Sequence, residues 1–145
     1  MGDLIVVLIL LAIGYGFGSY AERQHYKSIR EREKATLHVP IMTFGAKQSL
    51  PPAKETALFV GSVVVASDYF KTFALALRNL VGGRVLSYES LLDRGRREAL
   101  LRMKEEAIAW GATELANVRI NTSSLSQGGQ GMISIEVIAY GTGIR

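Results

Sequence analysis

The distribution of charge over the first 35 residues constrains this chain more than any other feature of its sequence. No charged residue occurs from Leu4 to Tyr20, and Leu4 to Ile13 is unbroken hydrocarbon. Residues 21–35 that follow carry both signs densely. A helix needs about 20 residues to cross a bilayer, with about 17 as the lower limit, and the uncharged run just reaches that limit. The pattern therefore predicts a transmembrane anchor at residues 1–20.

A cleaved signal peptide is the alternative interpretation of this segment. A signal peptide begins with basic residues, whereas this chain begins with Met1, Gly2 and the acidic Asp3. Its basic residues follow the apolar run instead, which is a stop-transfer pattern. The positive-inside rule then places the N-terminus outside and the rest in the cytoplasm. We expect a single-pass protein of the inner (cytoplasmic) membrane, with the lipid bilayer as a partner.

Two glycines within the apolar run, Gly14 and Gly18, are spaced as G-x-x-x-G. Small residues four apart lie on one helix face and let two helices approach closely in lipid. Glycine is also common in transmembrane helices without such a role. Gly14 and Gly18 are candidate oligomer contacts.

Residues 21–56 are predicted to form a charged helical neck and a linker. The mixed charges of residues 21–35 are typical of a solvated helix with ion pairs three and four residues apart. Prolines at 40, 51 and 52 end the helix, and residues 40–44 are a candidate short strand. His25 and His38 are the only histidines and are expected at the surface.

The net charge of +4 does not indicate a nucleic-acid partner, because Lys and Arg gather just after the apolar run. The chain has no Cys, which excludes disulfides, thiolate metal sites and Cys nucleophiles.

The domain predicted at residues 57–145 begins with a strand that is apolar on both faces. Residues 57–66 read Ala-Leu-Phe-Val-Gly-Ser-Val-Val-Val-Ala, without polar alternation. A strand of this kind must be covered on both faces. A domain this small has difficulty covering both, so a neighbouring subunit is the expected cover, with Val63 and Val65 as candidate contacts.

The remaining elements follow from periodicity and from capping residues. Helical spacing predicts helices at 69–81 and 87–110, with Glu105 and Glu106 on the solvent face of the second helix, and alternation predicts strands at 113–122 and 132–140 joined as a hairpin. The first of these strands would place Ala116, Val118 and Ile120 on one side. The second would point four residues inward, namely Ile133, Ile135, Val137 and Ala139. One layer of helices on one face of a largely antiparallel sheet is an α+β fold.

One combination of motifs resembles a known family. It consists of Gly82-Gly83-Arg84, then Tyr88-Glu89, then a charged helix ending in Trp110-Gly111-Ala112, then two strands split by a Gln/Gly loop. Over residues 58–145 the chain is similar to the bacterial YbjQ-like family, which carries a heavy-metal-binding label. The resemblance implies a dodecin-like α+β subunit that assembles into homo-oligomeric rings, commonly pentamers. The usual members of that family are soluble, so the anchor is a departure from it.

The metal label finds little support in these residues. Soft metals prefer thiolate and imidazole ligands, and the domain has neither Cys nor His. Oxygen ligands remain, at Asp68, Glu89, Asp93 and Glu136, without a recognisable ligand spacing. No cofactor is predicted, and a metal ion is implied by the family label alone.

Arg84, Tyr88 and Glu89 are the candidate ligand-binding residues. They would form a polar pocket at a helix start, in which Arg84 binds an anion. The alternative is structural, because the helix dipole favours Glu89 in the first turn and Arg84 can pair with it. No catalytic residues are predicted, because a domain without His cannot assemble a Ser-His-Asp set.

Two functions remain open. The first is a membrane-anchored homo-oligomeric scaffold with no identified protein partner beyond itself. The second is a module that binds a small ligand or heavy-metal ion between subunits.

Overall fold

The computed structural model describes the chain in five stretches, namely residues 2–45, 47–49, 51–66, 86–125 and 134–145. The helix predicted at 69–81 and the Gly-Gly-Arg segment at 82–84 lie outside the described residues. Most of the predicted Gln/Gly loop also lies outside them.

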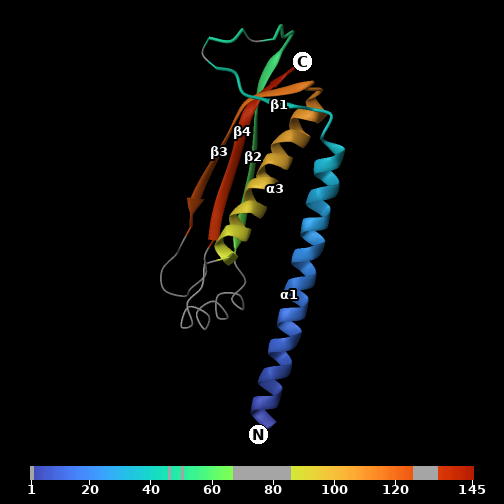
Figure 1. Cartoon of the computed structure of the whole chain (residues 1–145), viewed down its shortest axis with the longest axis vertical. Helices are drawn as coiled ribbons and strands as arrows, with labels where there is room; N and C mark the ends of the chain where they lie inside the picture. Colours follow the sequence, from blue (N-terminus) through green and yellow to red (C-terminus); the bar gives the residue numbers. More distant parts are fainter. Residues whose placement is uncertain (1, 46, 50, 67–85, 126–133) are drawn as a thin grey trace.

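A single helix, α1 (Gly2–Ala35), joins the apolar run to the charged neck without a break. The boundary expected between residues 20 and 21 therefore falls inside one element. The N-terminal half of α1 extends beyond the other described elements (Figure 1), and the large apolar side chains described there, such as Ile9 and Leu10, are exposed.

In the described part of the chain, no helix offers a stretch both long and apolar enough to span a bilayer. The transmembrane anchor predicted at residues 1–20 is therefore wrong, as are the single-pass inner-membrane location and the outside N-terminus. The unbroken hydrocarbon ends at Ile13, and the glycines and Ser19 that follow add little apolar surface. An apolar run of about 10–14 residues is shorter than a membrane span requires.

The described residues form a sheet of four strands in the order β1-β3-β4-β2. The strands are β1 (Ile41–Met42), β2 (Thr56–Ala66), β3 (Glu114–Ser124) and β4 (Ser134–Ile144). β4 pairs antiparallel with both β2 and β3, whereas β1 pairs parallel with β3.

The sheet is therefore mixed. The predicted fold class, a membrane anchor followed by a dodecin-like domain with an antiparallel sheet, is wrong. The described residues form an α+β domain with a mixed four-stranded sheet and two helices. The parallel pair escaped prediction because a two-residue strand carries no periodicity that reveals its partner or its direction.

The second described helix, α3 (Leu86–Trp110), packs on one face of the sheet against β2 and β4. Strict alternation along β4 turns Ile135, Val137 and Ala139 into this core, where each is fully buried. Glycine lets the helix come close to β2, because a Cβ on Gly61 would lie 2.2 Å from the backbone oxygen of Ala99. The core therefore depends on direct contact between backbones.

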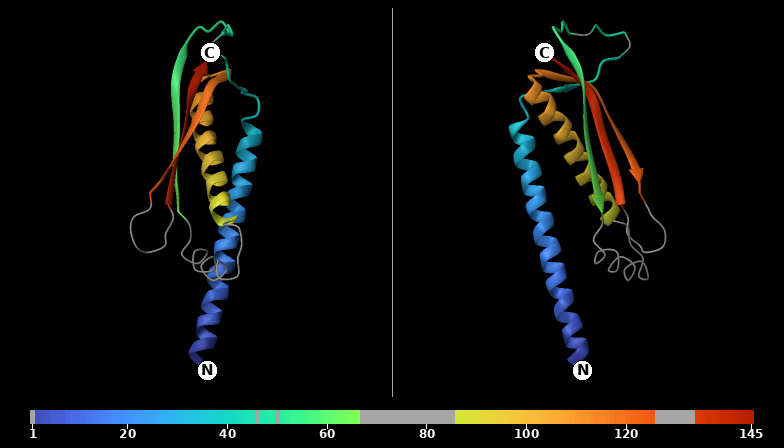
Figure 2. Two further views of the ribbon diagram at one scale, coloured as in Figure 1. Left: turned by 60° about the vertical axis from the view of Figure 1, so that its left-hand side comes forward. Right: turned by 180° about the vertical axis from the view of Figure 1, so that it is seen from behind.

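α3 lies between the sheet and α1 in both views of Figure 2. Ile29 is fully buried, and Thr36 and Val39 at the end of the neck are also buried. The neck is thus helical as predicted, but it packs against α3 and is not solvated on all sides. The burial falls on the C-terminal half of α1, beside the domain.

Candidate interaction surfaces

The three predicted ligand-binding residues are only partly within the described structure. Arg84 lies outside the described residues, and Tyr88 is placed only as a backbone position in α3. Glu89 is exposed in the first turn of α3. The structure therefore neither brings the three side chains together nor separates them.

Metal-ligating side chains do not gather within the described ranges. Among these residues, no group of three or more His, Cys, Asp or Glu could hold an ion. His38 lies beside its own helix end, with its Nδ1 3.0 Å from the carbonyl oxygen of Ala35. Neither observation identifies residues in the described ranges that could bind a heavy metal.

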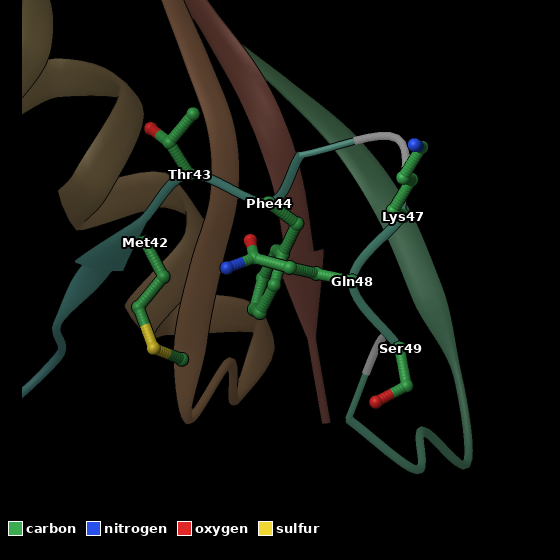
Figure 3. A pocket seen from close by; sticks show the side chains of 6 residues that line it. All are labelled: Met42, Thr43, Phe44, Lys47, Gln48 and Ser49. Carbon is green, nitrogen blue, oxygen red and sulfur yellow. The ribbon is translucent and has the colours of Figure 1, made fainter.

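An open cavity of about 640 Å³ lies beside the linker that follows β1, between Met42 and Ser49. Gln48 folds its amide back onto its own loop, because the backbone N–H of Gly45 donates to Gln48 Oε1 at 2.8 Å. The amine of Lys47 points away from Gln48 and from the ring of Phe44 (Figure 3). The polar groups around this cavity do not converge on a common point.

A cluster of ion pairs joins α1 to α3, and it is the most connected polar site in the described residues. Arg32 donates from Nε and Nη2 to the two carboxylate oxygens of Glu105, each at 2.7 Å. Its Nη1 donates to Glu98 at 2.9 and 3.1 Å. One guanidinium therefore links two carboxylates seven positions apart on α3.

A second bidentate pair joins the same two helices through the residues next to Glu98 and Arg32. Arg97 donates to Glu33 through Nε at 2.7 Å and Nη2 at 2.6 Å. Arg97 also lies over the ring of Tyr26, whose hydroxyl donates to the backbone oxygen of Ser90 at 3.1 Å. The two Arg forks fix the rotation of α1 about its axis as well as its distance from α3.

Two carboxylates in this cluster, Glu98 and Glu33, are held in their charged form. Burial favours the neutral form of Glu98, but hydrogen bonds from Arg102 and Arg32 outweigh it and lower the pKa of Glu98. The hydrogen bond from Arg97 likewise lowers the pKa of Glu33. Both side chains therefore carry a negative charge at neutral pH.

This cluster was not predicted from the sequence. Glu105 and Glu106 were expected on the solvent face of α3, whereas Glu105 faces Arg32. The spacing of opposite charges on both helices was visible, but pairing within one helix explained it equally well.

A second surface is the outer face of β2. Residues on the inner face pack against α3 and the core, so Val65 is buried and Val63 is half-buried. Leu58, Val60 and Val64 point the other way and are 69%, 48% and 58% exposed. Val63 and Val65, the predicted oligomer contacts, therefore face α3 and the core of their own domain. In α1, Gly14 is exposed and Gly18 is half-exposed.

β2 is also the terminal strand of the sheet. Within the described residues it pairs with β4 alone, over its full length from Thr56 to Ala66. Arg102 of α3 reaches this strand, where its Nη1 donates to the backbone oxygen of Ser62 at 3.0 Å. The Nε of Arg102 donates to Glu98 at 2.9 Å.

Comparison with known proteins identifies relatives of the domain. The family model YbjQ_1, described as "Putative heavy-metal-binding", matches residues 51–145. A UPF0145 protein of Natronomonas pharaonis is 44% identical over 70 residues, which cover 48% of this chain and 62% of the relative. A UPF0145 protein of Clostridium novyi is 36% identical over 89 residues, which cover 61% of this chain and 82% of the relative. One of Halobacterium salinarum is 38% identical over 84 residues, 58% of this chain and 76% of the relative. The family match begins after α1, so Arg32 and Glu33 lie outside it and their partners on α3 lie inside.

Proposed function

The chain belongs to the YbjQ-like family, and we propose that it is a homo-oligomeric scaffold whose subunits meet across the outer face of β2. The observation that carries the proposal is the exposure of Leu58, Val60 and Val64 on one strand face, with Ser62 between the two valines. An apolar row of this kind on a folded domain marks an interaction surface more often than an ordinary surface.

The neighbouring strand adds two apolar side chains to this face, and also Glu136, which pairs with Val64. Val60 pairs with Tyr140 and Ser62 pairs with Ile138, and both β4 side chains are half-buried on this outer face. The other side of the domain is different, because the C-terminal half of α1 covers α3 there. Of the two faces of the domain, the outer face of the sheet is the one that no described helix covers.

A scaffold of this kind would bring several copies of α1 together. Each subunit carries one α1 latched to its own α3, so assembly through β2 raises the local concentration of these helices without new contacts between them. This effect requires no ligand and no catalytic residue.

The test is native mass spectrometry of the full-length protein, combined with a substitution matched for exposure. Leu58 and Leu37 are 69% and 73% exposed, and only Leu58 lies on the outer face of β2. We expect a defined homo-oligomer for the wild type, dissociation for Leu58→Glu, and an unchanged mass for Leu37→Glu. A monomeric wild type, or equal effects of the two substitutions, would contradict the proposal.

The family description supports a second function, the binding of a heavy-metal ion. We propose Glu89, a candidate from the sequence, as a residue of that site. Elemental analysis of the same sample tests it. A stoichiometric metal that survives dialysis and is lost in Glu89→Gln, with assembly intact, would establish this function in place of a pure scaffold.

A further inference from the structure

The free edge of β2 offers a second surface through which this chain could pair with another copy. β2 has a neighbour on one side only within the described residues, so its other side offers backbone donors and acceptors to any extended strand. It is 11 residues long, and its outer face carries three exposed apolar side chains, Leu58, Val60 and Val64. Long, apolar edge strands pair readily with other chains unless something blocks them.

Arg102 lies at this strand. It comes from the part of α3 that backs β2, next to Met103, whose backbone nitrogen would lie 2.4 Å from a Cβ on Gly61. Its Nη1 donates to the backbone oxygen of Ser62, near the middle of the strand, and its side chain is 51% exposed. A charged side chain bonded to a backbone acceptor hinders another strand from using that acceptor.

The position of Arg102 is set by a carboxylate that α1 holds in place. The side chain of Glu98 is only 5% exposed, and its Oε1 accepts from both Arg102 and Arg32. Arg32 is itself fixed by its two bonds to Glu105. A continuous chain of hydrogen bonds therefore runs from α1 through Glu98 and Arg102 to β2.

We propose that Arg102 guards the edge of β2 against pairing with a strand of a second copy, and that the docking of α1 holds this guard in place. The inference rests on the proposed assembly and adds a control on it. Undocking of α1 removes Arg32 from Glu98, frees the carboxylate to turn, and releases Arg102 from Ser62.

A second copy is the occupant because the chain carries a matching edge. β1 pairs with β3 only at Leu115 and Ala116, so the outer half of β3 from Arg119 to Ser124 has a strand on one side alone in the described structure. Two different unpaired edges on one sheet permit head-to-tail pairing between copies. This pairing would leave the outer face of β2 available to the same assembly.

The experiment measures the dissociation constant of the full-length protein by sedimentation velocity over a concentration series. Arg102→Ala should lower it by about fivefold, because a backbone acceptor is freed for one additional hydrogen bond between the copies. Arg32→Met should also lower the dissociation constant, by a smaller factor. Arg96→Ala, an exposed arginine of the same helix, is the matched control and should change nothing.

A second readout locates the effect. Hydrogen exchange at β2 amides should slow on association in Arg102→Ala more than in the wild type. Arg102→Lys keeps the charge, but its single ammonium group cannot bind Glu98 and Ser62 together as the planar guanidinium does. The slowing of exchange in Arg102→Lys should therefore lie between that of the wild type and that of Arg102→Ala.

The outcomes separate this inference from the proposed function. If the wild type assembles and Arg102→Ala leaves the dissociation constant unchanged or raises it, the guard is overturned and the scaffold stands. If Arg102→Ala tightens assembly and Arg32→Met does not, the control by α1 is overturned. If the wild type and Arg102→Ala are both monomeric, both proposals fall.

Discussion

Arg32 on α1 and Glu105 on α3 form two parallel hydrogen bonds of 2.7 Å, although 73 residues separate them in the chain. The same guanidinium also binds Glu98, whose side chain is nearly buried. The attachment of α1 to the domain therefore depends mainly on charge, with Ile29 as the fully buried apolar side chain of the neck.

Arg32→Met should destabilise the protein by about 2 kcal/mol. Removing one partner of a buried ion pair costs about 3–5 kcal/mol when the other charge is left alone, and Arg102 still compensates part of the charge of Glu98. Urea unfolding at fixed protein concentration measures the change. The control is Lys27→Met, which removes an exposed pair of 3.9 Å with Glu31 and should change little. Equal losses in the two variants would contradict a special role for Arg32.

Stability should fall with acid because of the same carboxylates. Glu98 and Glu33 have pKa values lowered from 4.5 in the folded protein, so their stabilisation is present above that pH. It is lost as the pH falls through the folded pKa values. We expect the free energy of unfolding, measured with urea between about pH 7 and pH 3, to decline below about pH 4.5 in the wild type. The decline should be shallower in Glu98→Gln. Parallel curves for the two proteins would show that Glu98 does not contribute.

The helix at 87–110 and the strand at 132–140 could be predicted because each shows a clear period in the sequence, and the strand at 57–66 because it is a short continuous apolar run. The structure confirms the strand at 57–66 and the helix at 87–110 within a residue or so, as β2 and α3. On β4, the predicted inward set of Ile135, Val137 and Ala139 is fully buried. These predictions needed only the pattern of apolar residues within each element.

Alternation failed on β3, where a bulge interrupts the register between Ala116 and Arg119. Asn117 has a φ of 53°, a conformation that Asn tolerates better than most residues, and its side-chain oxygen accepts from the backbone N–H of Phe44 at 2.9 Å. As a result Leu115 and Ala116 are both buried, while Ile120, predicted to share a face with Ala116, is 40% exposed. A single residue with positive φ leaves no mark on the apolar pattern.

The charged neck could not be placed from sequence for a different reason. Mixed charges on a helix are compatible with a solvated surface and with pairing to a second charged helix, and only the relative position of α1 and α3 decides between them. The same ambiguity affected the apolar run, because an uncharged segment at the lower length limit fits several environments.

Gly61→Ala should be among the most damaging single substitutions in the domain. The added Cβ would lie 2.2 Å from the Ala99 oxygen and 2.4 Å from the Met103 nitrogen, both backbone atoms that cannot turn aside. We expect α3 to be pushed from β2 and stability to fall by about 3 kcal/mol. Gly16→Ala is the control, because nothing lies within 4 Å of its Cβ. There the higher helix propensity of Ala should raise stability by up to about 1 kcal/mol. Urea unfolding of the two variants distinguishes a steric effect from a general effect of replacing glycine.

The last residue, Arg145, closes the end of the domain opposite the N-terminus of α1 (Figure 1). Its guanidinium carbon lies 4.1 Å from the centre of the Trp110 ring, and its Nη1 donates to the Trp110 backbone oxygen at 2.8 Å. Its Nε also donates to Glu55 at 2.9 Å. One side chain thus joins the end of α3 to the start of β2.

Arg145→Ala should therefore lower stability by about 1–2 kcal/mol, through the lost ring contact and hydrogen bonds. Trp110 is the only tryptophan, so its fluorescence reports this site directly and should change with the substitution. Arg145→Lys keeps the charge but cannot stack its planar group on the ring, so its stability should lie between the two. If Arg145→Lys matches the wild type in both measurements, charge alone accounts for the contact and the planar geometry contributes nothing.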